Sequence, residues 1–157
     1  MKLTIALLVP VLLALVSNAE PAKLQFDSTY DNPDGRLDAV ACSDGPNGLI
    51  TRGYGPTFST LPQFNEYKHI GSAAAIEGWN SVNCGTCWTL NYTTKFFQKE
   101  ITVFVMDAAK EGFVLSEEAM NDLTGGQASA LGQVEVDAQP VSCTGMLSDC
   151  KSIQTHG

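Results

Sequence analysis

The chain carries two kinds of residue that do chemistry, a Cys-x-x-Cys pair and several isolated carboxylates and amides. The pair is Cys84 and Cys87, a spacing used for zinc binding, thiol redox chemistry or disulfide bonding, depending on the compartment. A zinc site needs further ligands, and His69 and His156 are not spaced to supply them. A redox pair begins a helix, whereas residues 88–92 predict a strand. We therefore expect disulfides, with no metal and no cofactor.

The first residues predict the compartment. Lys2 precedes an apolar run, Ile5 to Val16, and small residues follow at Ser17 and Ala19. This pattern is typical of a secretory signal peptide, residues 1–19, cleaved before Glu20. No later run approaches the roughly 18 apolar residues of a membrane-spanning helix. We expect an extracellular or cell-wall protein with one domain at residues 20–143 and a polar tail at 144–157.

Five cysteines lie after the leader, and an oxidising compartment favours disulfides among them. Four cysteines allow three pairings, so spacing alone does not choose one. Either Cys143 or Cys150 is the fourth bridged cysteine. Cys150, when it is left over, stays free or joins two chains in a dimer; otherwise we expect a monomer.

The charge of the chain excludes some partners. Its formal net charge is −8 at pH 7, and removal of Lys2 with the leader makes it more negative. Such a chain repels phosphate backbones and anionic lipids, so we expect neither nucleic acid nor membrane as a partner. An uncharged polysaccharide meets no such repulsion, whereas a polyuronate does.

Strands are predicted to outnumber helices. Alternation or apolar runs predict strands at residues 37–42, 99–106 and 132–138, the second of them buried on both faces. One helix is predicted after the N-cap Ser116, and it ends at Gly125-Gly126. Ala119, Met120 and Leu123 form its inward stripe.

Several blocks of sequence occur in a fixed order and resemble the cerato-platanin family of small secreted fungal proteins. The blocks span most of Tyr30 to Val136 and comprise Tyr30-Asp31-Asn32, residues 40–51 (VACSDGPNGLIT), Ile70-Gly71, residues 78–88 (GWNSVNCGTCW), and residues 119–124 with 126–128.

The resemblance implies a mainly β fold, a six-stranded double-psi β-barrel with one or two short helices, and the disulfides Cys42–Cys84 and Cys87–Cys143. It also implies non-catalytic binding of chitin-type oligomers of N-acetylglucosamine and elicitation of plant defence, with plant cell-wall or immune components as partners. For some members of the family, the implied function also includes expansin-like loosening of cellulosic material.

Asp107 is the first candidate for ligand binding, because it ends a buried strand where small residues follow. Its carboxylate there accepts hydrogen bonds from sugar hydroxyls; its structural alternative is to bind nearby backbone amides in a turn. Short polar side chains suited to hydroxyl-rich ligands supply the remaining candidates, which are Asp44, Asn47, Asn121, Gln127, Tyr30 and Asp31.

The aromatic residues and histidines have simpler interpretations. Trp79 and Trp88 flank the Cys-x-x-Cys pair, and we favour core packing for both over stacking on sugar rings. Tyr54 lies between two glycines and is expected to be exposed, as are both histidines. Asn91 begins an Asn-x-Thr glycosylation sequon.

Two alternative functions stay open. A wall-modifying enzyme would need a second carboxylate near Asp107, for which Asp44 and Glu111 are the candidates. A surface-active film former would need a large exposed apolar patch. We expect no catalytic residue.

Overall fold

The structure is a computed structural model that describes residues 18–143. The predicted signal peptide therefore lies almost wholly outside the described residues, as do Cys150, His156 and the tail at 144–157. Within residues 18–143, no helix is long and apolar enough to cross a membrane.

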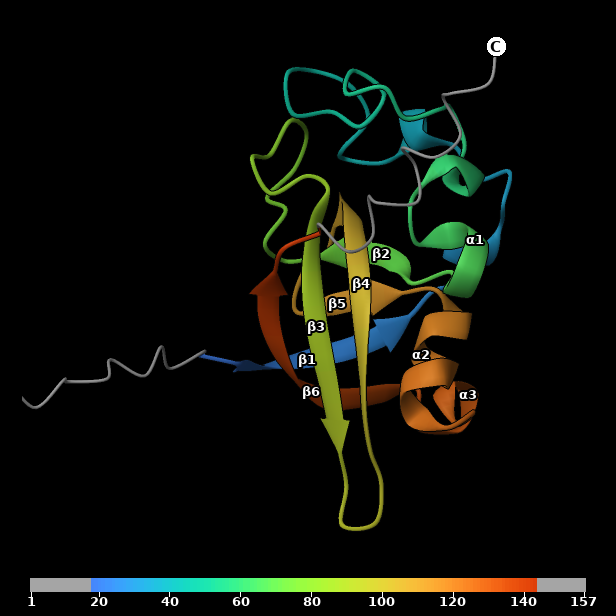
Figure 1. The fold of residues 1–157 in the computed structure, drawn as a ribbon, viewed down its shortest axis with the longest axis vertical. Helices are drawn as coiled ribbons and strands as arrows, with labels where there is room; N and C mark the ends of the chain where they lie inside the picture. The colour runs from blue at the N-terminus through green and yellow to red at the C-terminus, as the bar shows by residue number, and fades with distance from the viewer. Residues whose placement is uncertain (1–17, 144–157) are drawn as a thin grey trace, which may run out of the picture.

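Six strands close into a barrel in the order β1-β5-β2-β4-β3-β6, which confirms the predicted fold class (Figure 1). Two neighbouring pairs, β1 with β5 and β2 with β4, run parallel, and the other pairs run antiparallel. Closure pairs β6 with β1 and leaves no free sheet edge. The strands are β1 Glu20–Phe26, β2 Ile70–Ala73, β3 Thr86–Thr93, β4 Gln98–Ala108, β5 Phe113–Leu115 and β6 Gln133–Val141.

The predicted periodicities of two strands are confirmed. Residues 103–106 of β4 are all buried, because one face of the strand points into the barrel and the other is covered by neighbouring elements such as α2 (Glu117–Thr124). In β6, Val134, Val136 and Ala138 are buried and alternate with exposed polar residues. The β3–β4 hairpin extends beyond the barrel at the bottom of Figure 1.

Helix α2 begins and ends where the sequence predicts. The Ser116 hydroxyl oxygen accepts a hydrogen bond from the Ala119 N–H at 3.0 Å, and Gly125 ends the helix with a left-handed φ of 70°. Ala119, Met120 and Leu123 are buried. Residues 18–143 also contain two shorter α-helices, α1 (Phe64–Tyr67) and α3 (Ala128–Leu131).

Two disulfides, Cys42–Cys84 and Cys87–Cys143, join the loops to the barrel. They are the bridges that the family resemblance implies, and they make Cys143 the fourth bridged cysteine. The first bridge ties the base of the loop after Cys42 to the base of the loop before Cys84.

The predicted strand at residues 37–42 is wrong. Residues Leu37–Ala39 form a short 3-10 helix, η2, and turns follow it. Leu37, Val40 and Cys42 are buried, and this burial explains the apolar spacing that suggested a strand. Cys42 donates its N–H to Met106 O at 3.2 Å, so the segment packs against the end of β4 without pairing along it.

Candidate functional site

The Asp107 carboxylate lies at the end of β4, half-buried, and accepts three hydrogen bonds from the protein. Its Oδ1 atom accepts from the backbone N–H groups of Ala41 and Ala108, both at 2.8 Å. Its Oδ2 atom accepts from the Tyr30 hydroxyl at 3.1 Å. Asp107 thus holds the segment before Cys42 and the first 3-10 helix, η1 (Ser28–Asp31), against the end of the barrel.

The hydroxyl of Tyr30 is a permanent donor in this arrangement. Burial raises the pKa of the Tyr30 phenol well above its usual range, and the neighbouring Asp107 carboxylate raises it further. The phenol stays protonated at any pH the protein meets, so the Tyr30–Asp107 hydrogen bond keeps its direction.

Asp31 binds the start of helix α2, whereas its neighbour Tyr30 binds Asp107. Its carboxylate accepts from the N–H groups of Glu117 at 2.7 Å and Glu118 at 3.1 Å. These are orphan donors of the first turn of α2, where a negative charge also meets the positive end of the helix dipole. Asp31 therefore caps α2.

Asp44 and Asn47 lie on the loop after Cys42 and bind the loop before Cys84. Asp44 Oδ1 accepts from the Trp79 indole Nε1 at 2.6 Å. Asn47 donates its backbone N–H to Asn80 Oδ1 and its side-chain Nδ2 to Asn80 O, both at 2.9 Å. The two loops therefore form one connected surface above the Cys42–Cys84 bridge.

Asn121 and Gln127 lie at the other end of α2. Asn121 Oδ1 accepts from the Ala128 N–H at 3.0 Å, which explains an asparagine inside a helix: it joins α2 to α3. The Gln127 side chain is exposed. The next helix residue, Asp122, pairs with Lys99 at the start of β4, the strand that Asp107 ends.

The structure thus divides the sequence candidates into two regions. Ala41 binds Asp107 and is followed directly by Cys42, so Tyr30, Asp107, Asp44 and Asn47 gather at one end of β4. Asn121 and Gln127 lie toward the opposite end, and Asp31 lies between them at the start of α2.

The two carboxylates that the sequence offers as partners of Asp107 are engaged elsewhere. Asp44 binds Trp79, and Glu111 forms an ion pair with Lys23 at 3.0 Å. Hydrolysis by a carboxylate pair needs both groups to face one sugar bond. In the described part of the chain, no group of three or more His, Cys, Asp or Glu residues could hold a metal ion.

The expectation that Trp79 packs in the core is wrong, because 65% of its surface is exposed. Trp88 is half-buried, and its ring meets Phe113 edge-on at a centroid distance of 5.5 Å. The indole N–H of Trp79 donates to Asp44, which directly precedes Gly45 in a turn where the glycine has a φ of 81°.

Tyr54 and His69 are also placed differently from expectation. Tyr54 is half-buried and packs against Phe104. His69 is 6% exposed, with Nε2 at 3.0 Å from Asp122 Oδ2. Burial lowers the pKa of His69, although Asp122 acts in the opposite direction. Neither residue shows a signal in the sequence, because each is buried by elements distant along the chain.

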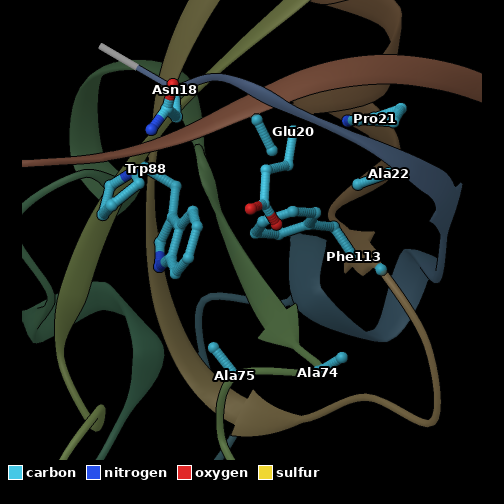
Figure 2. A pocket seen from close by; sticks show the side chains of 11 residues that line it. Asn18, Glu20, Pro21, Ala22, Ala74, Ala75, Trp88 and Phe113 are labelled. Carbon is cyan, nitrogen blue, oxygen red and sulfur yellow. The ribbon is translucent and has the colours of Figure 1, made fainter. Parts of the chain in front are cut away.

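Sequence reasoning did not find the pocket at one mouth of the barrel (Figure 2). It has a volume of about 400 Å³ and lies between Trp88, Phe113 and the first residues of β1. Figure 2 shows the Glu20 side chain reaching toward the two aromatic rings. The pocket is mainly apolar apart from this carboxylate and Asn18.

A closed mixed barrel of six strands, stapled by two disulfides, defines a class of small barrel proteins. The family described as cerato-platanin matches residues 22–152, and the chain belongs to this family. Its members are secreted fungal proteins.

Named relatives agree with this assignment. The heat-stable 19 kDa antigen of Coccidioides posadasii (strain C735) is 38% identical over 126 residues, covering 79% of this chain and 80% of the antigen. Allergen Asp f 15 of Aspergillus fumigatus is 41% identical over 129 residues, covering 80% of this chain and 79% of the allergen. Cerato-platanin of Ceratocystis fimbriata f. sp. platani is 28% identical over 130 residues, covering 80% of this chain and 90% of that protein. None of these names denotes an enzyme.

Solved structures support the same family assignment. The crystal structure of cerato-platanin 1 from M. perniciosa superposes with a TM-score of 0.74 at 41% identity, covering 80% of this chain and 98% of the other. The solution structure of the fungal elicitor cerato-platanin superposes with a TM-score of 0.66 at 29% identity, covering 80% and 96%. The family thus includes a protein described as an elicitor.

Proposed function

We propose that the chain is a secreted, non-catalytic protein that binds chitin-type oligomers of N-acetylglucosamine, at the fungal cell wall and in contact with plants, where it acts as an elicitor. The observation that carries the proposal is the exposed Trp79, whose indole N–H binds Asp44 on the loop that follows the Asp107-bound segment at the end of β4. Flat rings beside hydroxyl- and amide-binding groups suit sugars.

The hydrogen bonds of Asp107 favour binding over hydrolysis. A general acid must carry a proton to the leaving oxygen, whereas both carboxylate oxygens of Asp107 already accept hydrogen bonds from protein donors. Its two candidate partners bind Trp79 and Lys23. The wall-modifying alternative therefore has less support.

The distribution of exposed apolar residues favours binding over film formation. Trp79 and Val82 lie on the loop before Cys84, whereas Phe96 and Phe97 lie at the tip of the β3–β4 hairpin. Figure 1 shows these two segments at opposite ends of the molecule. They do not form one large patch, which a film former needs.

The partners follow from the same chemistry. A neutral sugar approaches an acidic surface without repulsion, whereas nucleic acid, anionic membrane and polyuronate are repelled. Plant cell-wall or immune components are the partners for an elicitor of this family, and we expect a monomer or a dimer linked through Cys150.

Calorimetric titration of the mature protein, residues 20–157, tests the proposal. The ligand is the N-acetylglucosamine tetramer, with a galacturonic acid tetramer as the charged control. We expect saturable heat with the neutral tetramer alone, and an intact tetramer by mass spectrometry after prolonged incubation. Absence of binding would refute the ligand, and cleavage products would refute the non-catalytic role.

A further inference from the structure

Trp79 combines wide exposure with a fixed orientation. With 65% of its surface exposed, it is one of the most accessible large apolar side chains in the described chain. An exposed tryptophan without restraint rotates among several rotamers, and each must be given up on binding. Trp79 is instead held by a hydrogen bond of 2.6 Å from its Nε1 atom to Asp44 Oδ1.

The turn beneath the indole is shaped to receive it. Gly45 has a φ of 81°, and a Cβ atom built there would lie 3.0 Å from Trp79 Cζ2 and 2.8 Å from Asn80 Oδ1. A side chain at this position would force Asn80 to shift and would crowd the indole, so the glycine permits both the turn and the close approach of the ring.

The loop that carries Trp79 is itself restrained. Asn80 adopts a left-handed φ of 59°, which is uncommon for residues other than glycine. Its side-chain and backbone oxygens accept the two hydrogen bonds from Asn47, and Cys84, at the base of the loop, is bridged to Cys42. The position of Trp79 is therefore set before any ligand arrives.

Polar groups surround the open part of the ring. Residues 77–83 line a hollow of about 520 Å³ that includes Glu77, Asn80 and Ser81. Carboxylate, amide and hydroxyl groups are partners for sugar hydroxyls and N-acetyl groups. The carboxylates of Glu77 and Asp44 disfavour an anionic ligand at the same place.

We propose that Trp79 is a stacking platform for one pyranose ring of a neutral N-acetylhexosamine oligomer, and that Asp44 positions the platform without needing to touch the sugar. This rests on the proposed function and names the binding subsite within it. The apolar face of the pyranose lies on the indole, and its polar substituents reach the groups of the hollow. Asp44 is a positioning residue here.

The test uses the two tryptophans of the chain. In a Trp88→Phe background Trp79 is the sole tryptophan, and its fluorescence should change saturably as the N-acetylglucosamine tetramer is added. Trp79→Ala should raise Kd about ten-fold, as truncation of a central aromatic contact does. Trp79→Phe keeps a flat ring and should stay within about three-fold of the parent.

Two further variants separate the roles. Phe96→Ala removes an exposed aromatic side chain from the tip of the β3–β4 hairpin, away from the hollow, and should leave Kd unchanged. Asp44→Ala should make the fluorescence anisotropy of Trp79 decay faster, because the indole is released and reorients more freely. It should weaken binding about three-fold, because the ring itself is still present. Calorimetry provides the affinities of the variants that lack Trp79.

The outcomes are distinguishable. If the parent binds the tetramer and Trp79→Ala binds equally well, the platform is wrong and the proposed function stands. If the parent binds no neutral tetramer, the proposed function fails and the platform fails with it. Equal losses of affinity for Phe96→Ala and Trp79→Ala would also overturn the platform, because they would point to a general apolar contact.

Discussion

Asp107 shows at the residue scale how one side chain supports both structure and a candidate site. It satisfies two backbone N–H groups and the Tyr30 hydroxyl. Replacement by alanine leaves these donors without an acceptor and should lower the free energy of unfolding by about 2–3 kcal/mol. Asp107→Asn keeps one carbonyl oxygen and should cost about 1 kcal/mol. Urea denaturation measures both, and an Asp107→Ala variant as stable as wild type would contradict this account.

The burial of His69 makes the stability of the fold depend on pH. Its folded pKa lies below the ordinary 6.5 because the ring is buried. The unfolded chain therefore takes up a proton first as the pH falls, so stability is full above about pH 6.5 and decreases below it. Burial, the largest single influence, would raise the pKa of Asp122, but the hydrogen bonds and charges of Lys99 and His69 together outweigh it and the pKa is lowered. Asp122 therefore adds a further loss of stability at lower pH, below its ordinary pKa of 3.8.

Thermal melting between pH 7.5 and pH 5 tests this expectation. Wild type should lose melting temperature steadily over the lower part of that range, and His69→Gln should show a flatter profile because it cannot take up the proton. Parallel profiles for the two proteins would show that His69 does not control the acid response.

At the element scale, α2 depends on two caps from different parts of the chain. Ser116 binds the Ala119 N–H, and Asp31 binds the N–H groups of Glu117 and Glu118. Ser116→Ala and Asp31→Ala should each lower stability by about 1 kcal/mol, which denaturant titration measures. Gln127→Ala, an exposed position near the end of the helix, is the control and should change stability little. A loss at Gln127 equal to that at Asp31 would contradict the capping role.

The elements also show what sequence patterns can predict. β4, β6 and α2 were predictable because their periodicity or caps are local features of the chain. The segment at 37–42 was misread because its apolar residues are buried by the barrel end and not by a partner strand. The short strands β2 and β5 pair with distant segments, and no local pattern reveals such pairing.

At the scale of the whole molecule, the two disulfides account for four of the five cysteines. Cys150 therefore has no cysteine left in its own chain with which to pair. Thiol titration of the unreduced protein under denaturing conditions should give about one thiol per chain, or a non-reducing gel should show a dimer that Cys150→Ser abolishes. A monomer without a free thiol would contradict the pairing.

The fold of the whole molecule was accessible from the sequence, but only part of the site was. The family resemblance implied the barrel and its bridges, whereas side-chain chemistry made Asp107 and Asn121 candidates for the same carbohydrate site. The structure places these two toward opposite ends of β4, because Asn121 binds Ala128 and its neighbour Asp122 binds Lys99. The position of Trp79 was not predictable from local sequence because its indole is held by Asp44, which lies on a loop distant along the chain.

The most direct test of the account is an NMR titration of the mature protein with the N-acetylglucosamine tetramer, followed through the backbone amides. Amide shifts should cluster at residues 41–47, 78–83 and 107–108, with little change at Asn121 and Gln127, and the sugar should be intact at the end. Shifts that centre on α2 and α3, or no shifts at all, would contradict it.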